Sequence, residues 1–352
     1  MIEKYKKFLL VFVGLLFCAS VIYTGGFIWA NTLENGTDGF YFTKNFLLEN
    51  TKDRPRIIFE SGSNSHHSIN SLMIEKEFKI FTLNLAENAR YPLNAKLHRL
   101  AKNLTKDDIV ILPLEYPYYY RNDDKMYNVN FSELVTYGKN YYNYLPINKK
   151  IFVLSKMNIK HSIKPFLNAY KYIIYKLFGG KFTFDMKANI RDIIASKERG
   201  DFNYTPWKQA GTSLADVDDN ENLSCQGYIF QKERENPIEQ IDRLIIIDYF
   251  KNNLEFIKKI SNQTGAKFIF TYPALAGKNC YDFKNNKYEY FLKDIKEYIK
   301  NNGFLFIGNP FDSYFPNNML NTYWHIDEKA RDIRTKRLIE ELKKTGLFNT
   351  NK

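Results

Sequence analysis

The segment "SGSNSHHS", residues 61–68, combines side chains that could do nucleophilic chemistry. It directly follows "RIIFE", residues 56–60, whose apolar residues predict a strand. A serine hydroxyl becomes a nucleophile when a histidine takes its proton and preorganised N–H groups stabilise the resulting oxyanion. Ser63, in the sharp turn after the strand, could be such a nucleophile. The alternative is that Ser63 caps the next helix, a position where serine is favoured.

Of the five histidines, His325 is our candidate for the base. It lies between the last predicted strand and the last predicted helix, in a loop that leaves the same edge of an open sheet as the serine turn. His66 and His67 would point along the first helix, away from the nucleophile, and adjacent residues do not share a face for a metal. His98 and His161 have no polar constellation around them. No metal or cofactor is therefore predicted, and the alternative for His325 is a partly buried histidine that fixes the last loop.

A sheet must position these residues, and the sequence predicts a doubly wound α/β fold with a mostly parallel sheet. Continuous apolar runs, rich in β-branched and aromatic residues, suit strands that are covered on both faces. The predicted strands are residues 56–60, 80–86, 108–116, 267–273 and 304–310, and the predicted helices are residues 68–78, 92–105, 284–301 and 327–345. Between about residues 120 and 234 the pattern breaks, which we interpret as an insertion at the carboxyl edge of the sheet.

The N-terminus predicts a single membrane-spanning helix. Residues 8–30 contain no charged side chain, and a helix of this length can cross a hydrocarbon core about 30 Å thick. Lysines before it and acidic residues after it predict a cytoplasmic N-terminus and a main domain exported across a bacterial inner membrane. The segment is longer than a signal-peptide core, which favours an uncleaved anchor; cleavage after Ala30 is the alternative. The expected parts are a cytoplasmic N-terminus (1–7), an anchor (8–30), a linker (31–50), an exported domain (51–346) and a tail (347–352).

The composition is that of a folded protein, because 44% of the residues are hydrophobic and there are 26 Tyr and 29 Phe. The net charge is +12, but the lysines are scattered and no zinc finger or RNA-recognition motif is present, so nucleic acid is not an expected partner. Cys225 and Cys280 fall in the exported part, where a disulfide could form and persist. Two cysteines do not prove the bond.

Three segments, in this order, resemble the SGNH/GDSL hydrolase superfamily: "SGSNS" (61–65), "DDIVILPLEYPYY" (107–119) and "NTYWHIDEKARDIRT" (321–335). In that superfamily a serine follows the first strand and an Asp/His pair precedes the final helix. More specifically, the chain resembles the single-anchor SGNH-like proteins that accompany membrane-bound O-acyltransferases in surface-polysaccharide acylation. The resemblance covers about half of the chain.

The resemblance implies transfer of an acyl group, in the first instance acetyl, to an extracytoplasmic glycan. Ser63 would attack the acyl donor, and His325 would act as base and then as acid. A multi-spanning membrane-bound O-acyltransferase would supply the acyl group, because acyl-CoA is confined to the cytoplasm. The cell-surface polysaccharide would be the acceptor.

The chain departs from the family pattern at the residue that orients the base. Asn321 stands where the pattern has an aspartate four residues before the histidine. An asparagine can orient His325 by a hydrogen bond, but it does not stabilise the imidazolium with charge. Asp312 and Asp327 are the alternatives for this role.

The oxyanion residues also depart from the pattern, because the glycine and the asparagine of the family have no clear counterparts. We assign the oxyanion donors to the backbone at Ser63 and Asn64, with Asn84 and Asn88 as further candidates. Glu115 and Tyr116, at the end of the third predicted strand, could line the acceptor cleft. Glu115 could instead pair with an arginine of the final helix.

Two other functions fit the same residues. A glycan O-acyl esterase would use the same serine and histidine and would differ only in letting water compete with the acceptor. A non-catalytic scaffold would keep the fold to bind glycan or to hold a partner. A serine within hydrogen-bond reach of His325 would argue against the scaffold.

Overall fold

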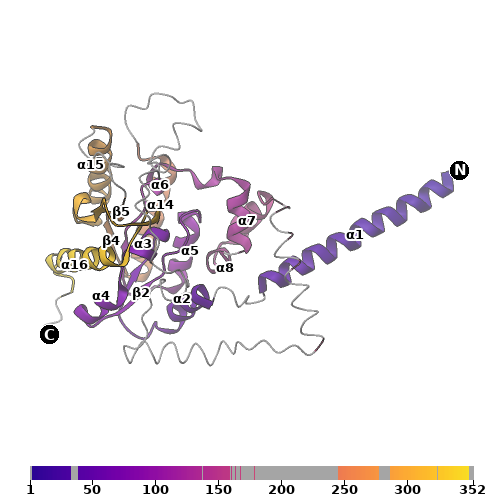
Figure 1. Ribbon diagram of the computed structural model, residues 1–352. Helices are drawn as coiled ribbons and strands as arrows, with labels where there is room; N and C mark the ends of the chain where they lie inside the picture. The colour runs from indigo at the N-terminus through magenta and orange to yellow at the C-terminus, as the bar shows by residue number, and fades with distance from the viewer. Residues whose placement is uncertain are drawn as a thin grey trace. The chain divides into compact units, whose positions relative to one another are not determined.

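The computed structural model describes residues 2–32, 39–136, 138–158, 245–276, 286–322 and 324–348, and the single residues 160, 163, 167 and 178 (Figure 1). The chain divides into two compact units. One unit comprises Met1–Phe42 and Met126–Asn189, and its described residues are helical where they form regular structure. The other comprises Thr43–Lys125 and Ile190–Lys352 and contains the sheet and the candidate site.

The second unit is built on a five-stranded sheet with the order β2-β1-β3-β4-β6, in which every neighbouring pair is parallel. The strands are β1 (Arg56–Phe59), β2 (Phe81–Asn84), β3 (Ile109–Leu112), β4 (Lys267–Thr271) and β6 (Leu305–Ile307). Each lies within one of the apolar runs predicted as strands. The prediction of a parallel α/β sheet is therefore confirmed.

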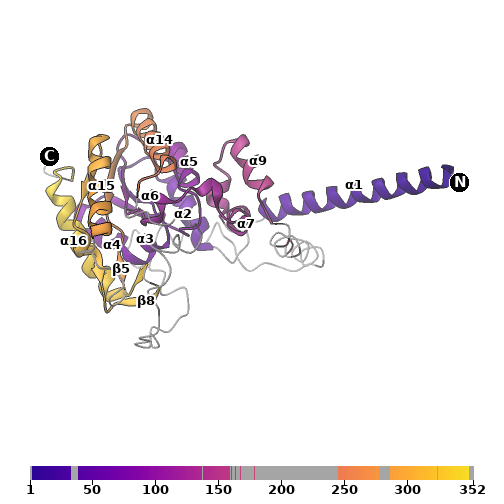
Figure 2. The same ribbon diagram turned by 90° about the horizontal axis from the view of Figure 1, so that it is seen from above.

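Helices cover both faces of this sheet, because successive residues of a buried strand point to opposite sides and both are apolar here. Ile58 and Val110 point to the face that packs against α5 (Leu93–Asn103), α14 (Asp248–Thr264) and α15 (Asn286–Asn301). Ile57 and Ile111 point to the face that packs against α4 (Ser71–Phe78) and α16 (Glu328–Lys344). The two layers of helices can be followed in Figure 2. The sheet is thus doubly wound.

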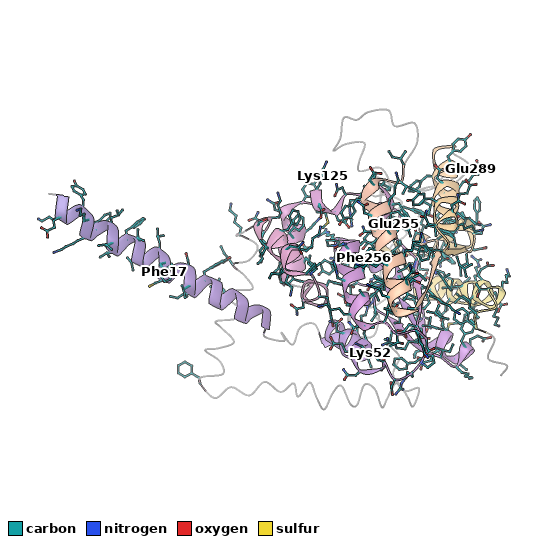
Figure 3. All side chains as sticks on the ribbon, turned by 180° about the vertical axis from the view of Figure 1, so that it is seen from behind. Phe17, Lys52, Lys125, Glu255, Phe256 and Glu289 are labelled. Atoms are coloured by element: carbon teal, nitrogen blue, oxygen red, sulfur yellow. The ribbon has the colours of Figure 1, made fainter. Side chains whose placement is uncertain are left out.

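Two of the longer helices, α14 and α2 (Gly39–Asn50), were not predicted. α14 buries Phe250, Leu254 and Ile257, which are spaced four and three residues apart as on one face of a helix. In Figure 3, Glu255 and Phe256 mark this helix, and the Phe256 ring packs on His98 of α5. α2 lies in the segment expected to be a linker, and its Leu47 and Leu48 join the core.

Short elements surround the carboxyl edge of the sheet. The helix predicted over residues 68–78 is α4, which begins at Ser71, and a separate short helix, α3 (Ser63–Ser68), precedes it across Ile69 and Asn70. The others are α6 (Pro117–Tyr120), η1 (Asp123–Lys125), β5 (Leu275–Ala276), η3 (Pro310–Ser313), β7 (Tyr314–Phe315), β8 (Met319–Thr322) and β9 (His325–Ile326). β8 and β9 form an antiparallel hairpin, so His325 belongs to a short strand and not to a loop.

The first unit contains α1 (Ile2–Thr32), which is long and apolar enough over Glu3–Tyr23 to cross a membrane. It is the one such helix among the residues that the structure describes, and its side chains over residues 3–22, such as Phe17 in Figure 3, are exposed. α7 (Asn128–Thr136), α8 (Lys139–Tyr142) and α9 (Ile147–Ser155) form the described start of the predicted insertion. Cys225 and Cys280 lie outside the described residues.

Candidate active site

The structure brings Ser63 and His325 together, although they are 262 residues apart in the chain. Ser63 is the first residue of α3, just after β1, and its Oγ lies 2.9 Å from Nε2 of His325 in β9. Both side chains are partly exposed. A hydroxyl at this distance from an imidazole nitrogen has the geometry of a nucleophile and its base. The pair lies at the carboxyl edge of β1, beside the point where the strand order reverses between β1 and β3.

The turn that carries Ser63 is held on both sides by buried contacts. The Ser61 hydroxyl donates a hydrogen bond to the Pro113 carbonyl oxygen, 2.7 Å away, in the loop after β3. Gly62 packs so closely that a Cβ there would lie 2.3 Å from the Glu115 Oε1 and 2.5 Å from the Ala89 Cβ. Position 62 of the turn therefore requires glycine for steric reasons. Ser61 and Gly62, which precede Ser63, are both held in place by these contacts.

Asn64 ties the serine turn to the segment that carries His325. Its Nδ2 donates to the carbonyl oxygens of Ala274, 2.5 Å away, and Trp324, 2.7 Å away. Its Oδ1 accepts a hydrogen bond of 3.1 Å from the Ala274 N–H. Because Trp324 directly precedes His325, this one amide sets the spacing between nucleophile and base. Asn64 was also predicted to be an oxyanion donor through its backbone, but its N–H already donates a hydrogen bond to a partner within the protein.

That partner is Glu115, whose Oε1 accepts the Asn64 N–H at 3.0 Å. Glu115 is 3% exposed, and burial raises the pKa of its carboxyl group to about 7. The hydrogen bond from Asn64 and the charges of Arg121 and Lys96 act in the opposite direction. Glu115, in the segment that follows β3, thus supports the serine turn through this hydrogen bond.

The described contacts do not pair Glu115 with an arginine of the final helix, and they place Tyr116 in the core and not in an open cleft. In α16, Arg334 donates to the Tyr272 carbonyl oxygen at 2.6 Å, and Arg331 pairs with Glu328 and Asp332. Tyr116 is 3% exposed, and its ring packs edge-on against Phe291 and Trp324. Tyr116 therefore supports the residue next to His325 from the core.

The other two predicted oxyanion donors, Asn84 and Asn88, make hydrogen bonds to the backbone. Asn84 is buried, its Nδ2 donates to the Ser65 carbonyl oxygen at 2.9 Å, and its Oδ1 accepts from the Ala86 N–H. The Asn88 Oδ1 accepts a 2.9 Å hydrogen bond from the Arg90 N–H and so closes a turn. Asn84 braces α3 against β2, whereas Asn88 is not brought to Ser63 by any described contact.

No described contact joins His325 to either of the two aspartates considered as its partners, Asp312 and Asp327. Asp327 caps α16 by accepting the Ala330 N–H at 2.7 Å, and its other oxygen accepts from Asn318 at 2.8 Å. Asp312 is exposed, and its backbone oxygen accepts from Arg337. Asn321 lies in β8, and its side chain is outside the described part of the structure. Among the described contacts, no carboxylate takes the place of the aspartate in a triad.

His66 and His67 differ most from the prediction, because they do not point away from the site. The ring centroid of His67 lies 4.1 Å from that of His325, with the planes at 42°. His66 packs edge-on against His67 at 4.8 Å, and its Nδ1 lies 3.1 Å from the Nζ of buried Lys44 in α2. The physical reason is helical spacing: Ser63 and His67 are four residues apart in α3 and so share one face.

Burial favours the uncharged form of each side chain in this group. It lowers the pKa of His325 to about 4 and the pKa of both neighbouring imidazoles well below the usual 6.5. It also lowers the pKa of Lys44 to about 7. At neutral pH His325 is therefore in the neutral form, which a general base needs. The described residues contain no cluster of His, Cys, Asp and Glu that could hold a metal ion.

A buried ionic cluster lies directly after β1 and was not predicted from the sequence. Glu60 accepts a 2.5 Å hydrogen bond from Arg99 of α5 and lies 3.7 Å from the Nζ of Lys96. Arg99 also pairs with Glu87 at 3.1 Å, and all these side chains are almost completely buried. A glutamate directly after a buried strand was the available signal. The cluster fixes the base of the serine turn to the helix layer.

Comparisons of the chain with protein-family models, with curated proteins and with solved structures gave no match. The geometry of the Ser63–His325 pair and the sequence resemblance concern the same two residues.

Proposed function

We propose that this protein is a membrane-anchored SGNH-like serine acyltransferase that moves an acyl group, in the first instance acetyl, to an extracytoplasmic glycan. The observation that carries the proposal is the 2.9 Å distance between the Ser63 Oγ and the His325 Nε2. A scaffold has no need to hold a serine hydroxyl against a neutral imidazole at the carboxyl edge of a sheet.

The strand order supports the finer assignment of the fold. β2-β1-β3-β4-β6 is the order of flavodoxin-like doubly wound sheets, in which ligands bind beside the strands where the order reverses. Ser63 follows β1 and Glu115 follows β3, so both stand at that place. An SGNH-like domain would place its nucleophile there.

The reaction follows from the two side chains. The Ser63 Oγ attacks the acyl carbonyl carbon of the donor while its proton passes to the His325 Nε2, and the imidazolium gives that proton to the leaving group. The acceptor hydroxyl of the glycan then attacks the acyl-serine ester, passing its proton to the same nitrogen. The ester bond to serine breaks, and His325 returns the proton to the Ser63 Oγ.

The anchor supports the expected partner. α1 is one apolar helix, so the donor would reach an exported site through a multi-spanning O-acyltransferase. With the N-terminus in the cytoplasm, the sheet-containing unit would face the cell-surface polysaccharide.

The test is labelling of the full chain in detergent micelles with a fluorophosphonate, comparing wild type with Ser63→Ala and His325→Ala. Ser155→Ala, which changes an exposed serine in α9, is the matched control. We expect labelling of the wild type and the control, and none of the two site variants. Turnover of p-nitrophenyl acetate that increases with a polysaccharide acceptor indicates transfer, whereas turnover indifferent to the acceptor indicates an esterase. If the wild-type protein is not labelled, even when co-expressed with a membrane-bound O-acyltransferase, the catalytic proposal is wrong and the non-catalytic scaffold is the remaining interpretation.

A further inference from the structure

His325 lies at one end of a row of three partly buried imidazole rings that pack against one another. Its Nε2 faces the Ser63 Oγ, and its ring lies against that of His67, with 4.1 Å between centroids. His66 lies against the other end of His67 at 4.8 Å, with the two planes at 85°. Three imidazoles from two segments of the chain thus pack in sequence, starting at the nucleophile.

The far end of the row is fixed by α2. Lys44 is 1% exposed, and its Nζ donates a hydrogen bond of 2.5 Å to the Ala86 carbonyl oxygen in the loop after β2. The same Nζ lies 3.1 Å from the Nδ1 of His66. Because Ala86 follows β2 in the sheet, Lys44 ties the row of imidazoles to the rigid part of the fold.

A serine–histidine pair needs a third group, because an imidazole that turns about its bonds presents its nitrogen to serine only part of the time. A carboxylate usually holds the ring. Here both carboxylate oxygens of Asp327 accept hydrogen bonds from other partners, and Asp312 is exposed. A flat ring packed against the imidazole restricts the same rotation by van der Waals contact.

We propose that His67, braced by His66 and Lys44, is a positioning residue that holds the His325 ring in the orientation that presents Nε2 to Ser63. The proposal deepens the serine acyl chemistry proposed above and, for its effect on rate, rests on it. The ring of His67, and not its charge, does this work, since burial and the neighbouring His325 and Lys44 both disfavour its protonation.

The packing also shields His325 from water. The titratable groups around it are His66 and His67 of α3 and Lys44 of α2, with Glu115 below the turn and Asp327 at the start of α16. Removal of the His67 ring would let water reach His325 and stabilise its charged form. The titration of His325 therefore reports the contact directly.

The experiment is an NMR titration of the full chain in detergent micelles with ring-labelled histidine, together with the rate of fluorophosphonate labelling. The chain has five histidines, so each signal can be assigned by its own substitution. His67→Ala removes the ring and His67→Phe keeps one. His98→Ala is the matched control, because His98 also packs on an aromatic ring, that of Phe256, at 4.8 Å.

In wild type, His67→Phe and His98→Ala we expect the His325 midpoint to stay at about 4. In His67→Ala it should rise by about one unit or more toward 6.5, and labelling should fall on the order of 10-fold to 100-fold. His67→Gln gives the same test if His67→Ala does not fold. An unchanged midpoint in the ring-less variants, or an equal loss of labelling in His67→Phe, would overturn the proposal. A shifted midpoint in a protein that is never labelled would sink the acyl chemistry and leave the positioning contact standing.

Discussion

Replacement of Gly62 by alanine should damage the serine turn through steric overlap alone. The backbone of Gly62 has φ −84° and ψ −170°, an extended conformation that any residue adopts, so the substitution brings no conformational strain. The added Cβ would lie 2.3 Å from the Glu115 Oε1, 2.5 Å from the Ala89 Cβ and 2.8 Å from the Ala89 Cα. Since one of these atoms is backbone, a side-chain rotation does not relieve the overlap.

The magnitude follows from these distances. Overpacking of a buried site costs about 1–3 kcal/mol of unfolding free energy. At about 2–4 °C per kcal/mol for a domain of this size, the melting temperature of Gly62→Ala should fall by about 2–12 °C. Removing the overlap requires the turn to move by about 1 Å, and a displacement of that size at a reacting group lowers its rate on the order of 100-fold.

Circular dichroism melting and fluorophosphonate labelling of the full chain measure both effects. Ala89→Gly removes the Cβ at 2.5 Å, so the double variant should recover part of the loss, with a coupling energy of about 0.5–3 kcal/mol. Gly308→Ala is the control: Gly308 has φ +85°, so alanine there costs stability by backbone strain without touching the serine turn. If Gly62→Ala melts and is labelled like the wild type, the close packing of the turn is refuted.

Three further predictions concern protonation and buried charge. Labelling of Ser63 needs neutral His325, whose pKa is about 4, so the labelling rate should persist down to about pH 5.5. At that pH about 97% of His325 is neutral, against about 9% of a histidine with the usual pKa. A labelling rate with its midpoint near pH 6.5 would contradict this. His325 has a higher pKa in the unfolded state, about 6.5, than in the folded state, about 4, so between these pH values the unfolded state binds more protons. The unfolding free energy should therefore rise by up to about 3 kcal/mol from pH 4 to pH 6.5. Urea unfolding should show this rise in the wild type and not in His325→Phe. Arg56 and Asp108 are both fully buried and 2.6 Å apart, so Arg56→Met should lower the unfolding free energy, measured in urea, by about 3–5 kcal/mol. The double variant Arg56→Met/Asp108→Leu should lose clearly less. Equal losses in the two variants would show that the pair is not coupled.

The sheet could be predicted because its strands are continuous apolar runs, such as "RIIF" in β1 and "IVIL" in β3. α14 was missed although Phe250, Leu254 and Ile257 have helical spacing, because the polar residues 251–253 and 255 that stand between them dilute the apolar signal. α2 follows an apolar anchor so closely that its own pattern was not separated from it. Its burial depends on contacts with distant parts of the chain, which local sequence does not reveal.

Ser63 and His325 could be selected because residue chemistry and the geometry of parallel sheets point to the same edge. The position of His67 depends on where α3 begins: a start at Ser63 puts both on one face, and a later start does not. Lys44 could not be selected at all, because nothing local marks a lysine for burial. Glu115 was expected at the end of the third strand and in fact lies three residues beyond β3, and its partner, the Asn64 N–H, is 51 residues away in the chain.

The buried charges around the turn bear on whether the site is catalytic or only structural. Taking Glu60, Glu87, Lys96 and Arg99 out of water costs several kcal/mol per ion, and apolar side chains of similar size would stabilise a fold at least as well. What the ion pairs provide is direction, because charge-assisted hydrogen bonds such as the 2.5 Å contact between Arg99 and Glu60 fix the end of β1 in one orientation. A scaffold has no use for that precision at residue 60. A hydroxyl that must meet an imidazole at 2.9 Å does, which is why we favour the catalytic interpretation.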